Sequence, residues 1–246
     1  MIFKKLKIFF NRQSFFIQKI SMKNNIINDP YSDYHIHSMF SDGCATIEEI
    51  VQFAWKIWMK EIAITDHSDK AIESEIKHAW IRPSWWARFA IINWRENIWN
   101  DTKVIFWVEC DVLNENWDVC FEIQKKVHDF NILSIHHHIY ESSNESAEKW
   151  LLTAIERYHD KISCIWHPYK QWFAEYMDMA PIVDLCNNYD IPIEFNRSTF
   201  DRKNYVEDKL MYVLKNTKRI YVNSDAHNLA RIKQLRKSCY DFLETL

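Results

Sequence analysis

The amino-acid sequence predicts a single-domain α/β fold in which parallel strands form a TIM-like barrel. Short β-type runs alternate with longer helical patterns, and most of the runs end in His, Asp or Glu side chains. Strict alternation of strands and helices favours a parallel sheet. In a barrel the carboxyl ends of all strands converge on one site, whereas an open sheet gathers its ligands near one switch point. Because the polar groups are spread over all the runs, a barrel fits better.

The strands are predicted from short apolar runs, each bounded by polar or turn-forming residues. The runs occur at Tyr34–His37, Glu61–Thr65, Lys103–Glu109, Ile132–Ile135, Ile162–Trp166, Ile191–Phe195 and Arg219–Asn223.

The segments between these runs have helical periodicity. In the first of them, Ile47, Ile50, Val51 and Ala54 follow the i, i+3, i+4, i+7 spacing, and Thr46 is placed to cap the helix. No Pro/Gly/Ser-rich linker divides the chain, so we expect one domain over residues 30–246. Four later helices are predicted at Ala147–Tyr158, Pro181–Tyr189, Tyr205–Asn216 and Asn228–Phe242.

Residues 1–29 differ in composition from the rest and precede the first polar motif. Residues 1–10 are basic and apolar but lack a small-residue cleavage site, so a signal peptide or a membrane-surface helix is one interpretation. The favoured interpretation is a dispensable N-terminal extension, disordered or not translated, with Met22 as an alternative start.

Composition restricts the class of protein. The net charge is −3 and no basic run is long enough for a nucleic-acid-binding arm, so no stable nucleic-acid partner is expected. The six cysteines form no CxxC pair, which favours free thiols in a reducing, cytoplasmic environment. No stretch approaches the ~20 apolar residues that span a bilayer. The oligomeric state is not predicted.

The chain has 1 glycine and 12 tryptophans. An average composition of ~7% glycine would give about 17, and tight turns need residues that tolerate positive φ. Several tryptophans stand where glycine is expected, among them Trp58 and Trp117 in turns and Trp107 and Trp166 beside polar motifs. One hypothesis is that the gene uses UGA as a glycine codon. The alternative is a protein that is truly rich in tryptophan, and the codons distinguish the two.

The first polar motif is a pair of histidines. His35 and His37 are two residues apart on a predicted strand, so both side chains lie on one face and can bind one metal ion. An HxH pair alone is weak support for a metal site. The further motifs around Asp42, His67 and Asp225 make the combination specific.

The motifs DYHIHS, SDG, ITDHS, SIH, HP, EFN and NSDAH, with a strand ending in Glu109, occur in this order. The combination resembles the PHP (polymerase and histidinol phosphatase) family over about residues 33–230. The resemblance implies a distorted seven-stranded (β/α) barrel with two or three divalent ions, Zn, Mn or Fe, at its carboxyl face.

The resemblance also implies which residues bind the metals. One ion would take His35, His37, Glu109 and Asp225, a second would take Glu109, His136 and His167, and a third would take Asp42, His67 and His227.

The chemistry of such a centre is hydrolysis. Glu109 is the carboxylate available to bridge two cations, and a water between them would have a pKa lowered toward ~7 and supply hydroxide to attack phosphorus. The cations would also neutralise charge on the phosphoryl oxygens. The residues expected to act in catalysis are Glu109, Asp225 and His227.

Some assignments have alternatives. His138 is the main rival of His136 because both lie on the same side of the strand, and Asp42 has a plain turn role as its alternative. We expect Asp66, Glu194 and Asn196 to orient ligands rather than bind metal. The three histidines interpreted as surface residues are His78, His128 and His159.

A substrate phosphate needs a further cation. Arg197 directly follows the Glu194–Asn196 strand end and is the preferred candidate, with Lys170 next; Arg82 and Arg88 are other possibilities. A solvated surface role is the alternative for each.

The favoured function is a stand-alone metal-dependent phosphoesterase acting on a small phosphomonoester such as histidinol phosphate. The histidinol phosphatase subgroup often has longer inserts around its first motifs, and here that stretch is the short Ser-Met-Phe-Ser-Asp-Gly, so the substrate stays open. One alternative is a nuclease acting on single-stranded DNA or RNA ends, although the acidic charge disfavours phosphate-backbone binding. Another is a non-catalytic PHP-like scaffold.

Overall fold

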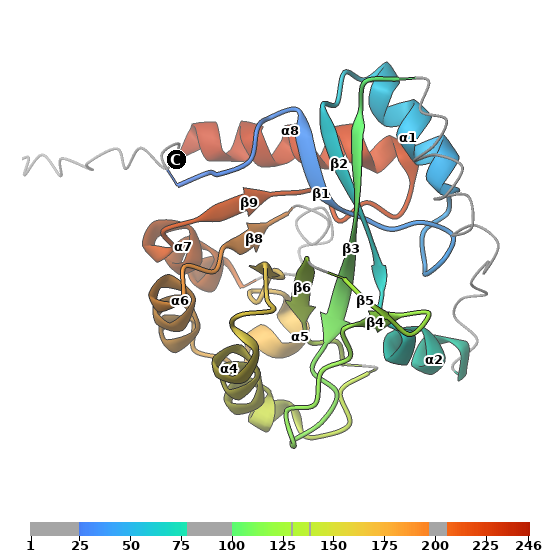
Figure 1. The fold of residues 1–246 in the computed structure, drawn as a ribbon. Helices are drawn as coiled ribbons and strands as arrows, with labels where there is room; N and C mark the ends of the chain where they lie inside the picture. Colours follow the sequence, from blue (N-terminus) through green and yellow to red (C-terminus); the bar gives the residue numbers. More distant parts are fainter. Residues whose placement is uncertain (1–24, 78–99, 129, 138, 197–205) are drawn as a thin grey trace, which may run out of the picture.

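A computed structural model describes residues 25–77, 100–128, 130–137, 139–196 and 206–246. Seven strands of the described chain form one parallel sheet, in the same order in space as in the sequence (Figure 1). The seven predicted runs are therefore confirmed as neighbours in one sheet. The strands are β1 (Ser32–Ile36), β2 (Glu61–His67), β3 (Lys103–Asp111), β6 (Asn131–Ser134), β7 (Cys164–Ile165), β8 (Ile193–Phe195) and β9 (Ile220–Val222).

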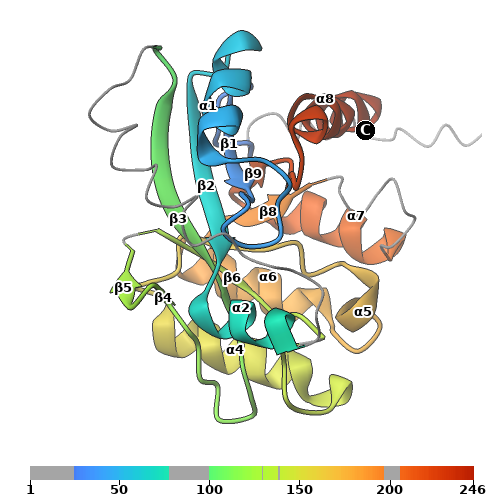
Figure 2. The ribbon, with the colours of Figure 1, turned by 90° about the vertical axis from the view of Figure 1, so that its right-hand side faces the viewer.

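Helices surround the outside of the curled sheet (Figures 1 and 2). The first helix packs on the last, and the helices after β6, β7 and β8 pack on one another in turn. The helices are α1 (Ile47–Lys56), α2 (Asp69–Lys77), α4 (Ala147–Tyr158), α5 (Gln171–Ala174), α6 (Met179–Asn188), α7 (Glu207–Asn216) and α8 (Leu229–Thr245), and one 3-10 turn, η2, covers Asn144–Ser146.

Local side-chain chemistry explains where the predicted helices begin. Thr46 caps α1 in a capping box with Glu49, as the sequence predicts. Helix α6 begins at Met179, two residues before the predicted start, because the Asp178 side chain accepts a hydrogen bond from the backbone N–H of Ala180. A capping carboxylate therefore sets this boundary, ahead of the first periodic apolar residue.

The sheet is curled but open. Strands β1 and β9 form its two edges, and a bridge between Ile36 and Ala226 joins them only beyond the end of β9. The backbone N–H of His37 donates to the carbonyl of Ala226 at 3.0 Å. The observed architecture is thus an α/β half-barrel whose edges meet at the carboxyl end, where the polar motifs lie.

Part of the expected N-terminal extension packs against the sheet. Ile26 forms a parallel bridge with Ile220, and the Asn28 side chain hydrogen-bonds both the N–H and the carbonyl of Val222. Residues 25–28 therefore run beside β9, and residues 1–24 lie outside the described residues.

Two hairpins were not predicted. Strands β4 (Glu122–Ile123) and β5 (Lys126–Val127) pair antiparallel between β3 and β6, and Val112 bridges Val119 just before them. Two-residue strands are too short to give a period-2 pattern that sequence reasoning can recognise.

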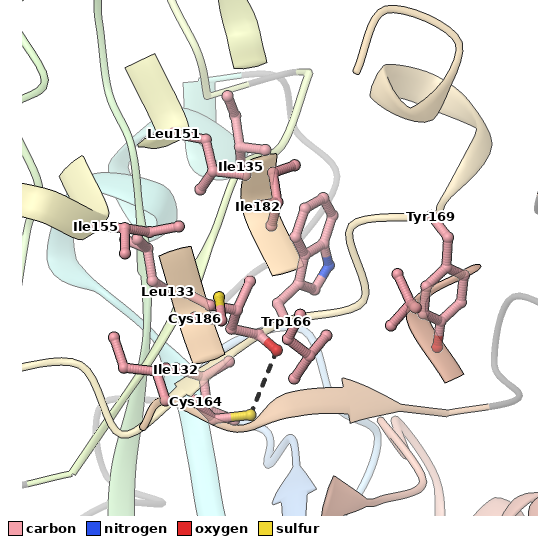
Figure 3. Close-up of a cluster of buried hydrophobic side chains, with 14 of the residues drawn as sticks. Ile132, Leu133, Ile135, Leu151, Ile155, Cys164, Trp166, Tyr169, Ile182 and Cys186 are labelled. Atoms are coloured by element: carbon pink, nitrogen blue, oxygen red, sulfur yellow. Dashed lines mark hydrogen bonds between the residues drawn. The ribbon is translucent and has the colours of Figure 1, made fainter. Parts of the chain in front are cut away.

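The largest apolar cluster lies between the sheet and α4, α6 and α7 (Figure 3). Buried residues of β6 and β7 pack there on Leu151, Ile155 and Ile182 from the helices. The cluster supports the strands whose carboxyl ends bear His136 and His167. Of the described helices, none is long and apolar enough to cross a membrane.

Candidate metal centre

All nine sequence-predicted ligand residues lie at the carboxyl ends of the strands or in the loops that follow them. Parallel register sets the first contacts, since His67 at the end of β2 pairs directly with Glu109 on β3. The scattered motifs thus become neighbours because parallel strands all end at one edge.

The imidazoles of His35 and His37 lie next to each other. Their Nε2 atoms are 3.0 Å apart, and both side chains are buried. The register of β1 against β2 shifts between Asp33 and Ile36, a bulge that contains His35.

Glu109 lies at the centre of the histidines. Its Oε2 is 3.3 Å from the Nε2 atoms of His35 and His37 and 3.3 Å from Nδ1 of His67, while its Oε1 is 3.7 Å from Nε2 of His136. One buried carboxylate therefore contacts four imidazoles, which is the position a bridging ligand needs.

A second carboxylate, that of Asp42, lies close to three histidines. Its oxygens lie 2.8 Å from Nε2 of His227, 3.3 Å from Nδ1 of His37 and 3.6 Å from Nε2 of His67. Asp42 faces the cluster rather than serving only as a turn residue.

Asp225 joins the two sides of the cluster. Its Oδ1 is 3.5 Å from Nε2 of His37 and its Oδ2 is 3.4 Å from Nε2 of His167. The backbone of Asp225 has a φ of 51°, a left-handed conformation that few non-glycine residues adopt. Strain of this kind persists where the surrounding structure imposes it, and such places are often functional sites.

Within the described part of the chain, three groups have ligand atoms close enough to share an ion. The grouping differs in part from that implied by the family resemblance, because His67 lies between Asp42 and Glu109, and His167 lies beside Asp225. The groups are His37, Asp42, His67 and His227; His35, His37 and Asp225; and His67, Glu109 and His136.

The donor set fits divalent cations. Nδ1 of His35 donates to Glu194 at 2.8 Å, and Nδ1 of His136 donates to Asp111 at 2.6 Å. In a neutral imidazole the ring nitrogen that donates leaves the other with a lone pair, and here both Nε2 atoms face Glu109. A lone pair that faces a carboxylate is stabilised by a cation between them, and the mixed imidazole and carboxylate set fits Zn, Mn or Fe.

The electrostatics of the cluster agree with that fit. Burial opposes the charged form of His37, but the carboxylates of Asp42, Asp225 and Glu109 raise its pKa to about 9. Burial likewise opposes the charged forms of Glu109 and Asp225, yet the surrounding histidines hold both pKa values well below the usual range. The buried carboxylates thus attract positive charge, as protons or as metal ions.

His167 behaves differently from the other histidines. Burial and the nearby ammonium of Lys170 lower its pKa. A lowered pKa keeps the imidazole neutral, which is the form that binds a metal ion.

The residues expected to orient ligands are also in place. Asp66 accepts hydrogen bonds from the backbone N–H and hydroxyl of Ser38 and from the hydroxyl of Ser41. It therefore holds the loop that presents Asp42. The carboxylate of Glu194 accepts hydrogen bonds from the imidazole of His35 and from the side-chain amides of Asn196 and Asn223.

Gly43, the single glycine, allows a close approach of this loop to β1. A Cβ at this position would meet the backbone carbonyl oxygen of His37 at 2.3 Å and its carbon at 2.5 Å. Both atoms belong to the backbone, so no side-chain movement can relieve the clash, and only glycine fits beside His37.

Asp111 is a functional candidate that sequence reasoning missed. It is buried, and besides His136 it accepts a hydrogen bond from the hydroxyl of Ser134 at 3.0 Å. The signal was available, because Asp111 follows Glu109 by two residues on β3 and so shares its face.

Replacing Asp111 by asparagine should weaken metal binding about 10- to 100-fold, the usual loss when a carboxylate behind a ligating histidine is removed. Metal titration of the purified protein would measure it. Asp101→Asn, an exposed position before β3, is the matched control. Equal affinity in both variants would show that Asp111 does not orient His136.

The cluster lines a cavity of about 180 Å³. Among the described residues that line it, Lys170 is the one Lys or Arg, and Trp166 and Phe173 form an apolar wall. The other phosphate candidates, Arg197, Arg82 and Arg88, lie outside the described residues, as do His138 and His78. His136 faces Glu109, His128 is half-buried, and His159 is exposed.

Comparison with known proteins adds a family and a fold. The PHP domain matches residues 33–222. A histidinol phosphate phosphatase from Lactococcus lactis subsp. lactis, solved with zinc, L-histidinol and phosphate, shares the fold with a TM-score of 0.52 and 18% identity, over 85% of this chain and 93% of that one. A Listeria monocytogenes protein, provisionally assigned as a histidinol phosphatase, gives a TM-score of 0.49 at 14% identity, over 82% and 97% of the two chains. A search of curated protein sequences finds no significant match.

Proposed function

Because this chain belongs to the PHP domain family, we propose that its buried His and carboxylate cluster hydrolyses a small phosphomonoester such as histidinol phosphate. The enzyme is a metal-dependent phosphatase of the hydrolase class. The observation that carries the substrate proposal is a small cavity whose floor is the ligand cluster and whose wall bears the cation Lys170.

We assign the metals to the nine converging residues, as two or three divalent ions. His35, His37 and Asp225 form one candidate group, and Glu109 connects it to His67 and His136. Metal ions held there would supply Lewis acidity toward the phosphoryl group and would activate water as the nucleophile. The protein's own contribution is to orient the imidazoles of His35 and His136, whose Nδ1 atoms contact Glu194 and Asp111, so that Nε2 is the atom that faces the ions.

In a centre of two ions that leaves the group of His37, Asp42, His67 and His227 without a metal, His227 is the candidate for proton exchange. Its Nδ1 lies 3.0 Å from the backbone carbonyl of Asp225, so Nε2 faces Asp42 and the cavity. Its side chain is 31% exposed, whereas those of His35 and His37 are fully buried. His227 is therefore the group of this cluster that can pass a proton between the leaving oxygen and solvent.

Lys170 is proposed to bind the substrate phosphate. Lys170→Ala should raise KM for the phosphomonoester about tenfold with a smaller change in kcat, because a charge-assisted hydrogen bond contributes about 1.5–3 kcal/mol and partial exposure reduces that. Steady-state kinetics and inhibition by inorganic phosphate would measure the effect. Lys233→Ala, an exposed lysine on α8, is the control. Unchanged KM and phosphate inhibition would remove Lys170 from the site.

The test of the function is phosphate release from a panel of phosphomonoesters that includes histidinol phosphate, with a short single-stranded DNA beside them and Mn or Zn supplied. Turnover of one small ester that is abolished by His35→Ala and retained by His159→Ala would establish the phosphatase. Turnover of DNA alone would make the protein a nuclease. Bound metal without turnover of any substrate would favour the non-catalytic scaffold. The cytoplasmic location and the catalytic domain over residues 30–246 stay proposals.

A further inference from the structure

Trp58 ends helix α1 in a backbone arrangement that is characteristic of glycine. Its φ is 66°, its N–H donates to the carbonyl of Trp55, and the N–H of Met59 donates to the carbonyl of Ala54. These two bonds define the Schellman motif, whose left-handed position is usually glycine. The Trp58 side chain is 80% exposed, so its packing does not explain the conformation. At the same position after α6 the chain has Asp190, a residue type that tolerates positive φ.

Trp117 occupies a second position of this kind. Its φ is 54°, and its N–H donates to the carbonyl of Asn114, while the N–H of Leu113 donates to the carbonyl of Asp118. Val112 and Val119 pair antiparallel just outside the turn. A turn followed by one left-handed residue is the hairpin form that places glycine at that residue. Gln124 and Lys125 also have positive φ, in the turn between β4 and β5, but a bulky indole is the more strained occupant.

The indoles inside the protein are poorly accommodated. The Nε1 atoms of Trp107, Trp117, Trp150 and Trp166 are buried and have no hydrogen-bond partner within the described part of the chain. Buried Trp N–H groups normally find an acceptor, because an unpaired buried donor is destabilising. Four such donors in one domain are therefore unexpected for a side chain that the fold selected.

Trp166 has a consequence for the metal centre. Its ring centroid lies 5.6 Å from that of His136 and 4.7 Å from that of His167, and its side chain is part of the cavity wall. Figure 3 shows the indole among the labelled residues of the core cluster. The cavity of about 180 Å³ is smaller than the roughly 300–1,000 Å³ typical of small-molecule sites. Without the indole, the space beside these two histidines would be larger.

We propose that the tryptophan codons of this gene are UGA read as glycine, and that glycine at position 166 sets the width of the substrate space. The first half rests on the backbone at positions 58 and 117, the buried indole donors, and the ratio of 12 Trp to 1 Gly. The second half rests on the proposed phosphatase function as well. Positions 58 and 117 then become helix-end and turn glycines, and position 166 opens the approach to His136 and His167.

The first test is independent of activity. The codons at positions 58, 117 and 166 are sequenced from the gene. The peptides that cover these positions are analysed by mass spectrometry, using protein isolated from the native cells. UGA codons with glycine masses would establish the reading. UGG codons, or tryptophan masses, would overturn it whatever the enzyme hydrolyses.

The second test uses purified variants of the full chain. Trp58→Gly and Trp117→Gly should each raise the thermal midpoint by about 2–4 °C, the shift typical of a small stabilisation in a domain of this size. Trp58→Ala and Trp117→Ala remove the indole but keep a Cβ at positive φ, so they should gain less. Equal gains for alanine and glycine would contradict the backbone argument.

The third test concerns the cavity. Trp166→Gly should increase kcat/KM for the phosphomonoester at least tenfold and raise the occupancy of metal, measured by elemental analysis, above that of the parent chain. Full metal occupancy and unchanged kcat/KM would overturn the role of position 166. If every variant lacks phosphatase activity, the proposed function fails, while the codons and the metal occupancy still decide this inference.

Discussion

Glu109→Gln should lower phosphate release by on the order of a thousandfold, because several kcal/mol of charge stabilisation correspond to that factor. Glu109 is 2% exposed and contacts four imidazoles at 3.3–3.7 Å. Glutamine keeps the volume but removes the negative charge that a bridging ligand supplies to two cations. We therefore expect loss of bound metal together with loss of rate, measured by elemental analysis and phosphate release.

The controls separate charge from position. Glu109→Asp keeps the charge on a shorter side chain and should retain part of the metal, whereas Glu244→Gln, an exposed position near the end of α8, should match the parent enzyme. A Glu109→Gln enzyme with full metal content and near-normal rate would show that this carboxylate is not the bridging ligand.

Arg236→Met should destabilise the fold by about 3–5 kcal/mol at neutral pH, since it removes one partner of a buried ion pair. Arg236 is 6% exposed, its Nε lies 3.9 Å from Oδ2 of Asp33, and it also bonds the carbonyl of Pro30 and the sulfur of Met59. Asp33 accepts hydrogen bonds from the N–H groups of His35 and Ser224. Asp33 therefore ties β1 to α8 through Arg236 and to the loop that bears Asp225 through Ser224.

The stability lost on replacing Arg236 should depend on pH. Burial raises the pKa of Asp33 from 3.8 to about 6, although Arg236 and the Ser224 hydrogen bonds lower it. A raised pKa in the folded state means that the folded protein binds the proton more tightly. Stability is therefore lost as pH rises from about 4 through about 6. Without Arg236 the pKa of Asp33 rises further, so the loss continues to higher pH.

Urea unfolding of Arg236→Met and the parent at about pH 5 and about pH 8 would measure this dependence. The difference should be larger at pH 8, where Asp33 has to be charged in the folded protein. Lys233→Met on the exposed side of α8 is the control. A pH-independent difference would mean that Arg236 acts through packing alone.

Periodicity and motif order were enough to predict much of this protein. The alternation of runs identified seven parallel strands in their spatial order, because short apolar runs and amphipathic helices have different periods. Motif order identified the family and the nine residues that converge, since parallel strands all deliver their carboxyl ends to one edge. The Thr46 cap was also predicted, because capping depends on residues that are close in sequence.

Tertiary structure decided what depends on distant residues. Only the fold places Asp111 behind His136 and Glu194 behind His35, 25 and 159 positions apart. The same holds for the Asp33–Arg236 pair and for His67 lying between Asp42 and Glu109. The sheet also stays open between β1 and β9, meeting only at Ala226. Such pairings depend on strand curvature and burial, which arise from the packing of the whole chain and leave no local pattern in the sequence.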